Sequence, residues 1–212
     1  MLKIIIFFIF SLIMLKISWP DIFDTHTRKF CRFFAFEFLF LLILVNFGYW
    51  LRNPFTVFRV FTWIILLSSF VIADCGIHHL LRGVNPQTKN EFLTTNDKVV
   101  TTFYQLLSLS FYNHIGQYIR NPRMLLDIET TTNLVTSGIY KYIRHPLYSS
   151  LIILGAVTLI KNPSLLATSL FSVGTVFLHA TARIEEKENL LKFGEDYAEY
   201  MTRSSMFFSF LF

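Results

Sequence analysis

Charged residues are scarce in this chain. Asp, Glu, Lys and Arg account for 16% of its 212 residues, against roughly 25% in an ordinary soluble domain, while 53% of the residues are hydrophobic. This composition excludes a typical soluble domain and predicts an integral membrane protein. The net charge of +5 is small and dispersed, and no basic stripe alternates with aromatic residues, so nucleic acid is not an expected partner.

Cysteine and glycine are also rare. The two cysteines, Cys31 and Cys75, lie in different segments without CxxC spacing, which predicts neither a disulfide framework nor a metal site. All eight glycines are solitary, so the chain lacks the GxGxxG pattern of a Rossmann dinucleotide-binding domain. We therefore expect no bound metal and no Rossmann domain.

What the chain has instead is a series of apolar segments. A membrane-spanning helix needs about 20 largely apolar residues, and fewer where a polar end reaches the interface. Five segments meet this requirement, so we expect an all-α, polytopic membrane bundle of about five transmembrane helices. The segments are residues 2–19, 33–51, 55–73, 146–160 and 163–182.

The first of these segments begins like a secretory signal, with Lys3 before an apolar run. The residues that follow, ISWPDIF, lack the small-residue cleavage site of a signal peptide, so we expect a retained membrane helix. A long polar stretch, residues 74–145, separates the third and fourth segments. Within it, residues 99–118 are only moderately apolar, and we interpret them as an interfacial helix or a re-entrant segment.

The distribution of Lys and Arg predicts the orientation, because cytoplasmic loops retain positive charge. With five spans and the amino terminus outside, fifteen of the 19 Lys and Arg residues fall on the cytoplasmic side. This asymmetry predicts a multi-pass protein whose carboxyl terminus lies in the cytoplasm. The four residues that fall on the outer side are Lys3, Arg52, Arg59 and Lys161.

The chain divides into three regions by composition. Residues 1–75 hold the amino-terminal membrane helices, residues 76–130 form a cytoplasmic or interfacial connection, and residues 131–212 form the carboxyl-terminal region. In this last region, apolar residues recur at helical spacing after residue 182, which predicts an amphipathic cytoplasmic helix. They are Leu190, Leu191, Phe193, Tyr197 and Tyr200.

The stretch GIYKYIRHPLYSS, residues 138–150, combines cations and a ring nitrogen at the start of an apolar segment. Pro146 suits the first position of a helix, whose free N–H groups and positive dipole end attract a carboxylate or phosphate. The turn KNPS then predicts an antiparallel hairpin, which returns Glu185 and Glu186 to the level of Arg144. Two carboxylates and two cations converging there can bind a zwitterion with hydroxyl groups.

These residues resemble a known family. The segments LVTSGIYKYIRHPLYSS, NPS and ARIEEKENLLKFGEDYAEYM are similar to those of the isoprenylcysteine carboxyl methyltransferase and phospholipid methyltransferase superfamily of integral membrane enzymes. The resemblance covers about residues 130–203, with the motifs in order and at the expected separation. It implies methyl transfer from S-adenosylmethionine to a lipid, a prenyl group or another hydrophobic acceptor, at a site facing the cytoplasm.

The resemblance also implies which residues form the site. Arg144 and Glu186 belong to the same motif and brace it, and together with His145 and Arg183 they are the expected catalytic residues. Arg183 is the nearest candidate for the family's substrate-contacting arginine, because the family position itself is Thr181 in this chain. The expected cofactor-contacting residues are Leu134, Val135, Tyr140, His145, Pro146, Leu147, Tyr148 and Glu185.

Two other functions stay open at this point. Sterol and steroid reductases that use NADPH also have carboxyl-terminal membrane helices ending in a related charged region. Alternatively, the Arg-His and Glu-Glu pairs of a non-catalytic membrane scaffold would merely hold the ends of helices in place. Binding of S-adenosylmethionine or of NADPH separates these possibilities, because a bound ligand raises the melting temperature.

Overall fold

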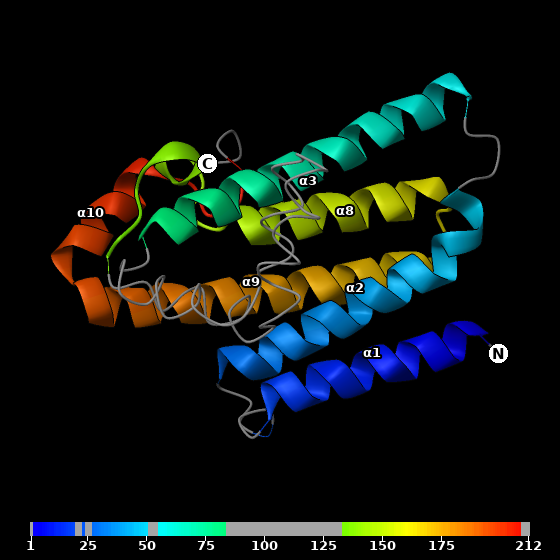
Figure 1. Ribbon diagram of the computed structural model, residues 1–212, viewed down its shortest axis with the longest axis horizontal. Helices are drawn as coiled ribbons and strands as arrows, with labels where there is room; N and C mark the ends of the chain where they lie inside the picture. The colour runs from blue at the N-terminus through cyan, green and yellow to red at the C-terminus, as the bar shows by residue number, and fades with distance from the viewer. Residues whose placement is uncertain (1, 20–22, 24–26, 51–54, 84–132, 209–212) are drawn as a thin grey trace, which may run out of the picture.

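The computed structural model describes residues 2–19, 23, 27–50, 55–83 and 133–208. Within these residues the fold is all-helical, as the sequence predicts, with no strand apart from one isolated bridge. The interfacial segment expected at 99–118 lies outside the described residues. The described helices are α1 (Leu2–Ser18), α2 (Arg28–Trp50), α3 (Val57–Gly83), α8 (Pro146–Lys161), α9 (Leu165–Phe193) and α10 (Glu195–Arg203), with a 3-10 turn, η2 (Gly138–Lys141) (Figure 1).

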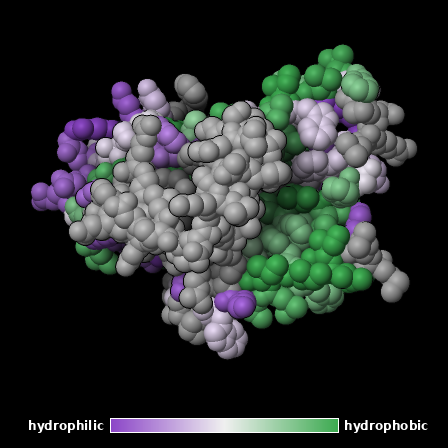
Figure 2. All heavy atoms as spheres, in the orientation of Figure 1, coloured by the Kyte–Doolittle hydropathy of each residue, from purple (hydrophilic) through white to green (hydrophobic). Residues whose placement is uncertain are grey.

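Three of the described helices, α2, α3 and α9, are long and apolar enough to cross a membrane. The 17 residues of α1 and the 16 residues of α8 are also apolar but shorter. Each of the five expected apolar segments therefore forms a helix. Hydrophobic side chains gather at one end of the molecule, and hydrophilic ones gather at the other end, around α10 (Figure 2).

Helix α9 is longer than the sequence predicts. We expected a span that ends at residue 182 and a separate amphipathic helix after it, but α9 runs unbroken from Leu165 to Phe193. No glycine or proline occurs between residues 175 and 193, so nothing in that stretch ends the helix. The break comes at Gly194, whose φ of 58° is accessible mainly to glycine. The separate helix, α10, therefore begins only at Glu195.

The core lies where α2 packs along α8 and α9, while α3 packs along α8 (Figure 1). Two glycines permit this close approach. A Cβ atom at Gly155 would lie 3.0 Å from Leu39, and one at Gly174 would lie 3.2 Å from the same side chain. The buried apolar residues at the centre of the bundle are Ala35, Leu39, Leu42, Tyr148, Ala167, Leu170, Leu178 and Ala182.

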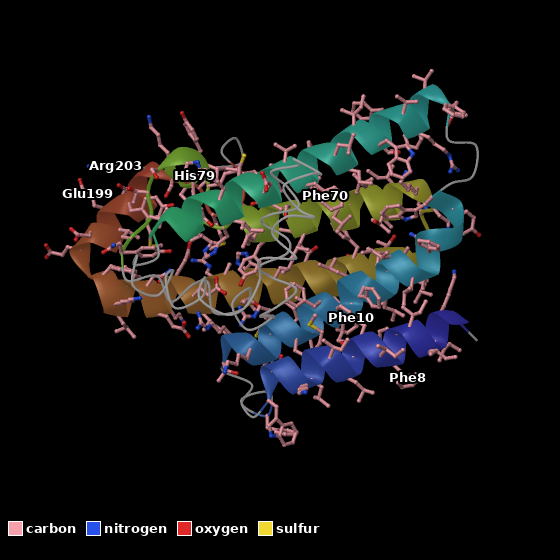
Figure 3. The ribbon with its side chains drawn as sticks, viewed as in Figure 1. Phe8, Phe10, Phe70, His79, Glu199 and Arg203 are labelled. Atoms are coloured by element: carbon pink, nitrogen blue, oxygen red, sulfur yellow. The ribbon has the colours of Figure 1, made fainter. Side chains whose placement is uncertain are left out.

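Helix α1 covers α2 from the outside. Phe10 stacks on Phe40 with their ring centroids 3.9 Å apart, whereas Phe8 points away from the bundle (Figure 3). The hydroxyl of Ser11 also donates to Glu37 Oε2 at 2.6 Å. The outward row of apolar side chains on α1 suits contact with lipid.

Polar contacts fix the end of α8 that is remote from His145. The ammonium group of Lys161 is buried, donates to Thr62 Oγ1 at 3.2 Å and lies 4.4 Å from the centroid of the Trp63 ring. Asn46 donates to the carbonyl of Thr158 at 2.9 Å. These contacts join α2, α3 and α8, so the bundle holds the opposite end of α8 in a defined position.

Candidate active site

The predicted hairpin of α8 and α9 is present. Asn162 ends α8, and the hydroxyl of Ser164 accepts a hydrogen bond from the N–H of Ala167 at 3.1 Å, which caps the start of α9. The two helices then run back along each other, and Glu185 comes to lie beside His145. Residues 40 positions apart in the chain thereby share one site.

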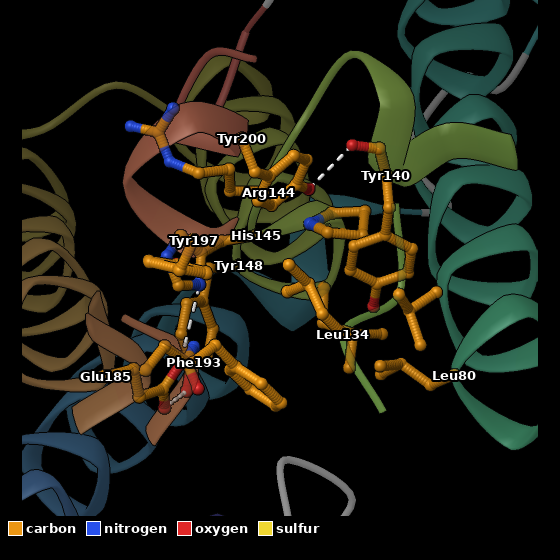
Figure 4. A pocket seen from close by; sticks show the side chains of 14 residues that line it. Leu80, Leu134, Tyr140, Arg144, His145, Tyr148, Glu185, Phe193, Tyr197 and Tyr200 are labelled. Atoms are coloured by element: carbon orange, nitrogen blue, oxygen red, sulfur yellow. Dashed lines mark hydrogen bonds and ion pairs between the residues drawn. The ribbon is translucent and has the colours of Figure 1, made fainter. Parts of the chain in front are cut away.

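A cavity opens where the hairpin meets η2 and the end of α3 (Figure 4). The cavity volume is about 90 Å³. The empty space around it, which is open to solvent, is about 640 Å³. All eight expected cofactor-contacting residues line this cavity. The lining is Leu80, Leu134, Val135, Tyr140, Arg144, His145, Pro146, Leu147, Tyr148, Glu185, Asn189, Phe193, Tyr197 and Tyr200.

A buried network of charges forms the polar wall of the cavity. His145 Nδ1 lies 3.4 Å from Glu185 Oε2, and His145 Nε2 lies 3.7 Å from Glu186 Oε1. Arg144 Nε donates to the same Glu186 oxygen at 2.8 Å, and the hydroxyl of Tyr148 donates to Glu185 Oε1. Two adjacent carboxylates are thus matched by two adjacent cationic groups, as the hairpin predicts.

Comparison with known proteins agrees with this geometry. Residues 97–193 match the model of the isoprenylcysteine carboxyl methyltransferase (ICMT) family. This region belongs to the ICMT family. The match indicates a methyltransferase enzyme, and the family implies S-adenosylmethionine as methyl donor and a hydrophobic acceptor. The comparisons with curated proteins and with solved structures gave no match.

Arg144 also connects the start of α8 to the carboxyl-terminal residues. Its Nη1 group donates to the carbonyls of Met201 and Ser204, so the guanidinium joins the start of α8 to the residues after α10. The backbone repeats the connection, because the N–H of Arg144 donates to Ser205 O at 2.8 Å and that of His145 donates to Met206 O at 3.1 Å. The residues after α10 therefore help to hold Arg144 and His145 in position.

Two of the expected catalytic residues lie off the cavity. Glu186 is buried and contacts Arg144 and His145 rather than the cavity. The guanidinium of Arg183 is 62% exposed, 3.9 Å from Glu186 Oε2. Arg183 lines a neighbouring cavity instead, which separates it from the eight expected cofactor contacts.

Sequence reasoning missed five residues that line the cavity. We assigned Phe193, Tyr197 and Tyr200 to the apolar face of a membrane-surface helix, yet both tyrosines are buried at the site, and Tyr200 donates to the carbonyl of Tyr140 at 2.6 Å. The motif FGEDYAEY contains these residues and was the available signal. Leu80 and Asn189 carried no signal, because only the packing of α3 and α9 brings them to the cavity.

Gly138 shapes the turn that presents Tyr140. Its φ of 63° lies in the left-handed region, and a Cβ atom at this position would lie 2.0 Å from Nε2 of His79. A larger residue would strain the turn and would require the His79 ring to move. This glycine therefore lets the turn close over the cavity.

The protonation of His145 follows from its surroundings. Burial opposes a charge on the imidazole, but the hydrogen bonds and charges of Glu185 and Glu186 outweigh burial and raise the pKa of His145 from 6.5 to about 9. His145 is therefore an imidazolium at neutral pH, already holding the proton that a general base would have to accept.

The raised pKa of His145 predicts a pH-dependent stability. A group whose pKa is higher in the folded state stabilises the fold fully below its unfolded pKa of 6.5, and this contribution disappears as the pH rises through about 9. We expect the melting temperature of the purified enzyme to fall between pH 6.5 and pH 9.5, measured by thermal unfolding in one detergent at constant ionic strength. His145→Gln should lack this decrease. Equal pH dependence in the two proteins would contradict the assignment.

Proposed function

We propose that this enzyme binds S-adenosylmethionine in the cavity beside His145 and Glu185 and transfers its methyl group to an acceptor dissolved in the membrane. The observation that carries the proposal is the convergence of eight residues, chosen from the family motif, on one cavity at the end of the bundle. The bound donor would supply an electrophilic methyl group on a positively charged sulfur.

The residues at the cavity suit this donor. The positive dipole end at the start of α8, next to Arg144 and the His145 imidazolium, favours a carboxylate. Glu185 offers a negative charge for an ammonium group or a ribose hydroxyl, and the rings of Tyr140 and Phe193 offer apolar faces.

The chain's main contribution to the reaction is orientation. Methyl transfer to a nucleophile is an in-line displacement, and the thioether leaves without needing a proton. Holding the two reactants in line can supply roughly 7–11 kcal/mol of the barrier. The bonds from Tyr148 and His145 to Glu185 fix the polar wall against which the donor would lie.

The protonation state of His145 bears on which class of methyl acceptor the site can use. An imidazolium cannot remove a proton from the ammonium group of an aminophospholipid, and the Glu185 carboxylate, the other base among the described lining residues, already accepts from Tyr148 and faces His145. A carboxylate or a thiolate needs no base. We therefore favour an acceptor with a carboxylate or thiolate on a prenyl or other apolar tail, as in a prenylated cysteine.

The membrane arrangement completes the proposal. With five spans and the cavity on the cytoplasmic side, a water-soluble donor would enter from the cytoplasm. The acceptor's apolar tail would approach laterally from the bilayer. Such a site joins two substrates that dissolve in different phases.

Membranes containing the enzyme, incubated with methyl-labelled S-adenosylmethionine and farnesylated cysteine, should incorporate label that mild base releases as volatile methanol. Methyl esters hydrolyse in this way, whereas methyl groups on nitrogen do not. Membranes without the enzyme serve as the control. Label that is entirely stable to base would contradict a carboxylate acceptor, and the absence of any enzyme-dependent label would contradict methyl transfer to this substrate class.

A further inference from the structure

A second cavity lies on the other side of Arg144. Its volume is about 650 Å³, and it is formed by α9, the end of α10 and the residues that follow α10. Among the described residues, Arg144 is shared by the linings of the two cavities. The second lining is Arg144, His179, Arg183, Met201, Thr202, Arg203, Ser204, Ser205, Met206, Phe207 and Phe208.

The ionisable side chains that line this second cavity are all basic. Three guanidinium groups and one imidazole line it, and none of its described lining residues is acidic. The side chains of Arg183 and Arg203 are 62% and 71% exposed, so a ligand can reach them. Each also contacts one carboxylate, Glu186 or Glu199, but a guanidinium carries five N–H donors and retains some for another partner (Figure 3). The cavity suits an anion with several oxygen acceptors.

Apolar side chains form the other part of the lining. The ring of Phe207 lies 5.9 Å from the ring of His179 and 6.2 Å from that of His145, so it separates the second cavity from the first. Met206 and Phe208 extend this surface. A ligand with a purely polar structure would leave these groups without a partner, whereas an amphiphile would contact both parts of the lining.

The position of the second cavity matches the membrane surface. Residues 165–178 of α9 contain no ionisable side chain, and charges begin at Arg183, just after His179. Hydrophilic side chains gather at the end of the molecule where α10 lies (Figure 2). Phospholipid phosphates lie at this boundary between apolar and charged residues, where basic side chains attract anionic lipids.

We propose that the second cavity binds the phosphate head group of an anionic phospholipid, with Arg183 and Arg203 contacting the phosphate and Phe207 and Phe208 contacting the beginning of an acyl chain. Arginine suits this ligand because its planar donors match two phosphate oxygens at once. The lipid would hold the segment after α10 at the membrane. Since that segment bonds to the backbone of Arg144 and His145, its anchoring supports the first cavity without taking part in the reaction.

The test uses the purified full chain in an uncharged detergent. Phosphatidylglycerol or phosphatidylcholine with identical acyl chains is added, and both the melting temperature and the number of retained lipids, by native mass spectrometry, are measured. We expect phosphatidylglycerol alone to raise the melting temperature and to be retained. The double variant Arg183→Gln/Arg203→Gln should bind it at least tenfold more weakly.

The matched control is Lys187→Gln/Lys192→Gln, which removes two exposed charges from α9, the helix that carries Arg183, but none from the cavity lining. It should bind phosphatidylglycerol as the wild type does. Equal loss in the two double variants, or no preference for phosphatidylglycerol in the wild type, would overturn the proposal. Arg203→Gln alone, at an exposed position, provides a second variant and should weaken binding about threefold.

Two further measurements distinguish a bound lipid from free phosphate and from the methyl acceptor. Inorganic phosphate at millimolar concentration should leave the melting temperature unchanged, and a full shift with phosphate alone would overturn the lipid assignment. Farnesylated cysteine should not displace phosphatidylglycerol, and displacement would instead assign the cavity to the acceptor. None of these readouts depends on methyl transfer, so the lipid proposal and the proposed reaction can fail separately.

Discussion

Replacing Glu185 with glutamine is expected to reduce methyl transfer by about 100-fold or more while the protein stays folded and inserted in the membrane. Glutamine keeps the volume of the side chain but removes the charge that faces His145 Nδ1 and accepts from Tyr148. A hydrogen bond to a charged group contributes roughly 1.5–3 kcal/mol, and two such bonds meet at this carboxylate. The initial rate of label transfer from S-adenosylmethionine measures the effect.

Glu188→Gln is the matched control for this prediction. Glu188 lies on the same helix, its side chain is 48% exposed, and it pairs with Arg28 at 3.3 Å away from the cavity. Its loss should change the rate less than twofold. Retention of wild-type activity by Glu185→Gln would show that the cavity beside His145 is not where the donor binds.

Replacing Arg144 with alanine is expected to cause the largest loss of stability. The variant leaves Glu186, whose side chain is 3% exposed, without its closest cation, and it frees the carbonyls of Met201 and Ser204. Removing one partner of a buried ion pair costs about 3–5 kcal/mol. For a chain of this size that corresponds to a decrease of roughly 6–20 °C in melting temperature.

Arg183→Ala provides the comparison, because its guanidinium also faces Glu186 but is largely exposed and 3.9 Å away. Exposed ion pairs contribute about 0–1 kcal/mol, so this variant should melt within about 4 °C of the wild type. The melting temperatures of both variants are measured in the same detergent. Similar values for the two arginine variants would contradict the bracing role of Arg144.

The parts of the site that could be predicted are those encoded by short-range patterns. Pro146 indicates the start of α8, the turn at Asn162 indicates the hairpin, and the hairpin alone brings Glu185 to His145. These relations need only the geometry of two helices and a turn. The family motif then identified the cavity lining from Leu134 to Tyr148.

The parts that could not be predicted depend on contacts between distant segments. Burial of Tyr197 and Tyr200 requires α10 to turn back at Gly194, and the apolar spacing of these residues equally suits a helix on the membrane surface. Leu80 reaches the cavity because α3 continues beyond the apolar segment that we assigned to residues 55–73. The second cavity exists only because the segment after α10 pairs with Arg144, and no local pattern encodes that pairing.

Equilibrium binding of labelled S-adenosylmethionine to the purified enzyme tests the central claim most directly. We expect saturable binding at one site per chain, competed by S-adenosylhomocysteine, unaffected by NADPH and lost in Glu185→Gln. Absence of saturable binding, or saturable binding of NADPH in its place, would contradict the account.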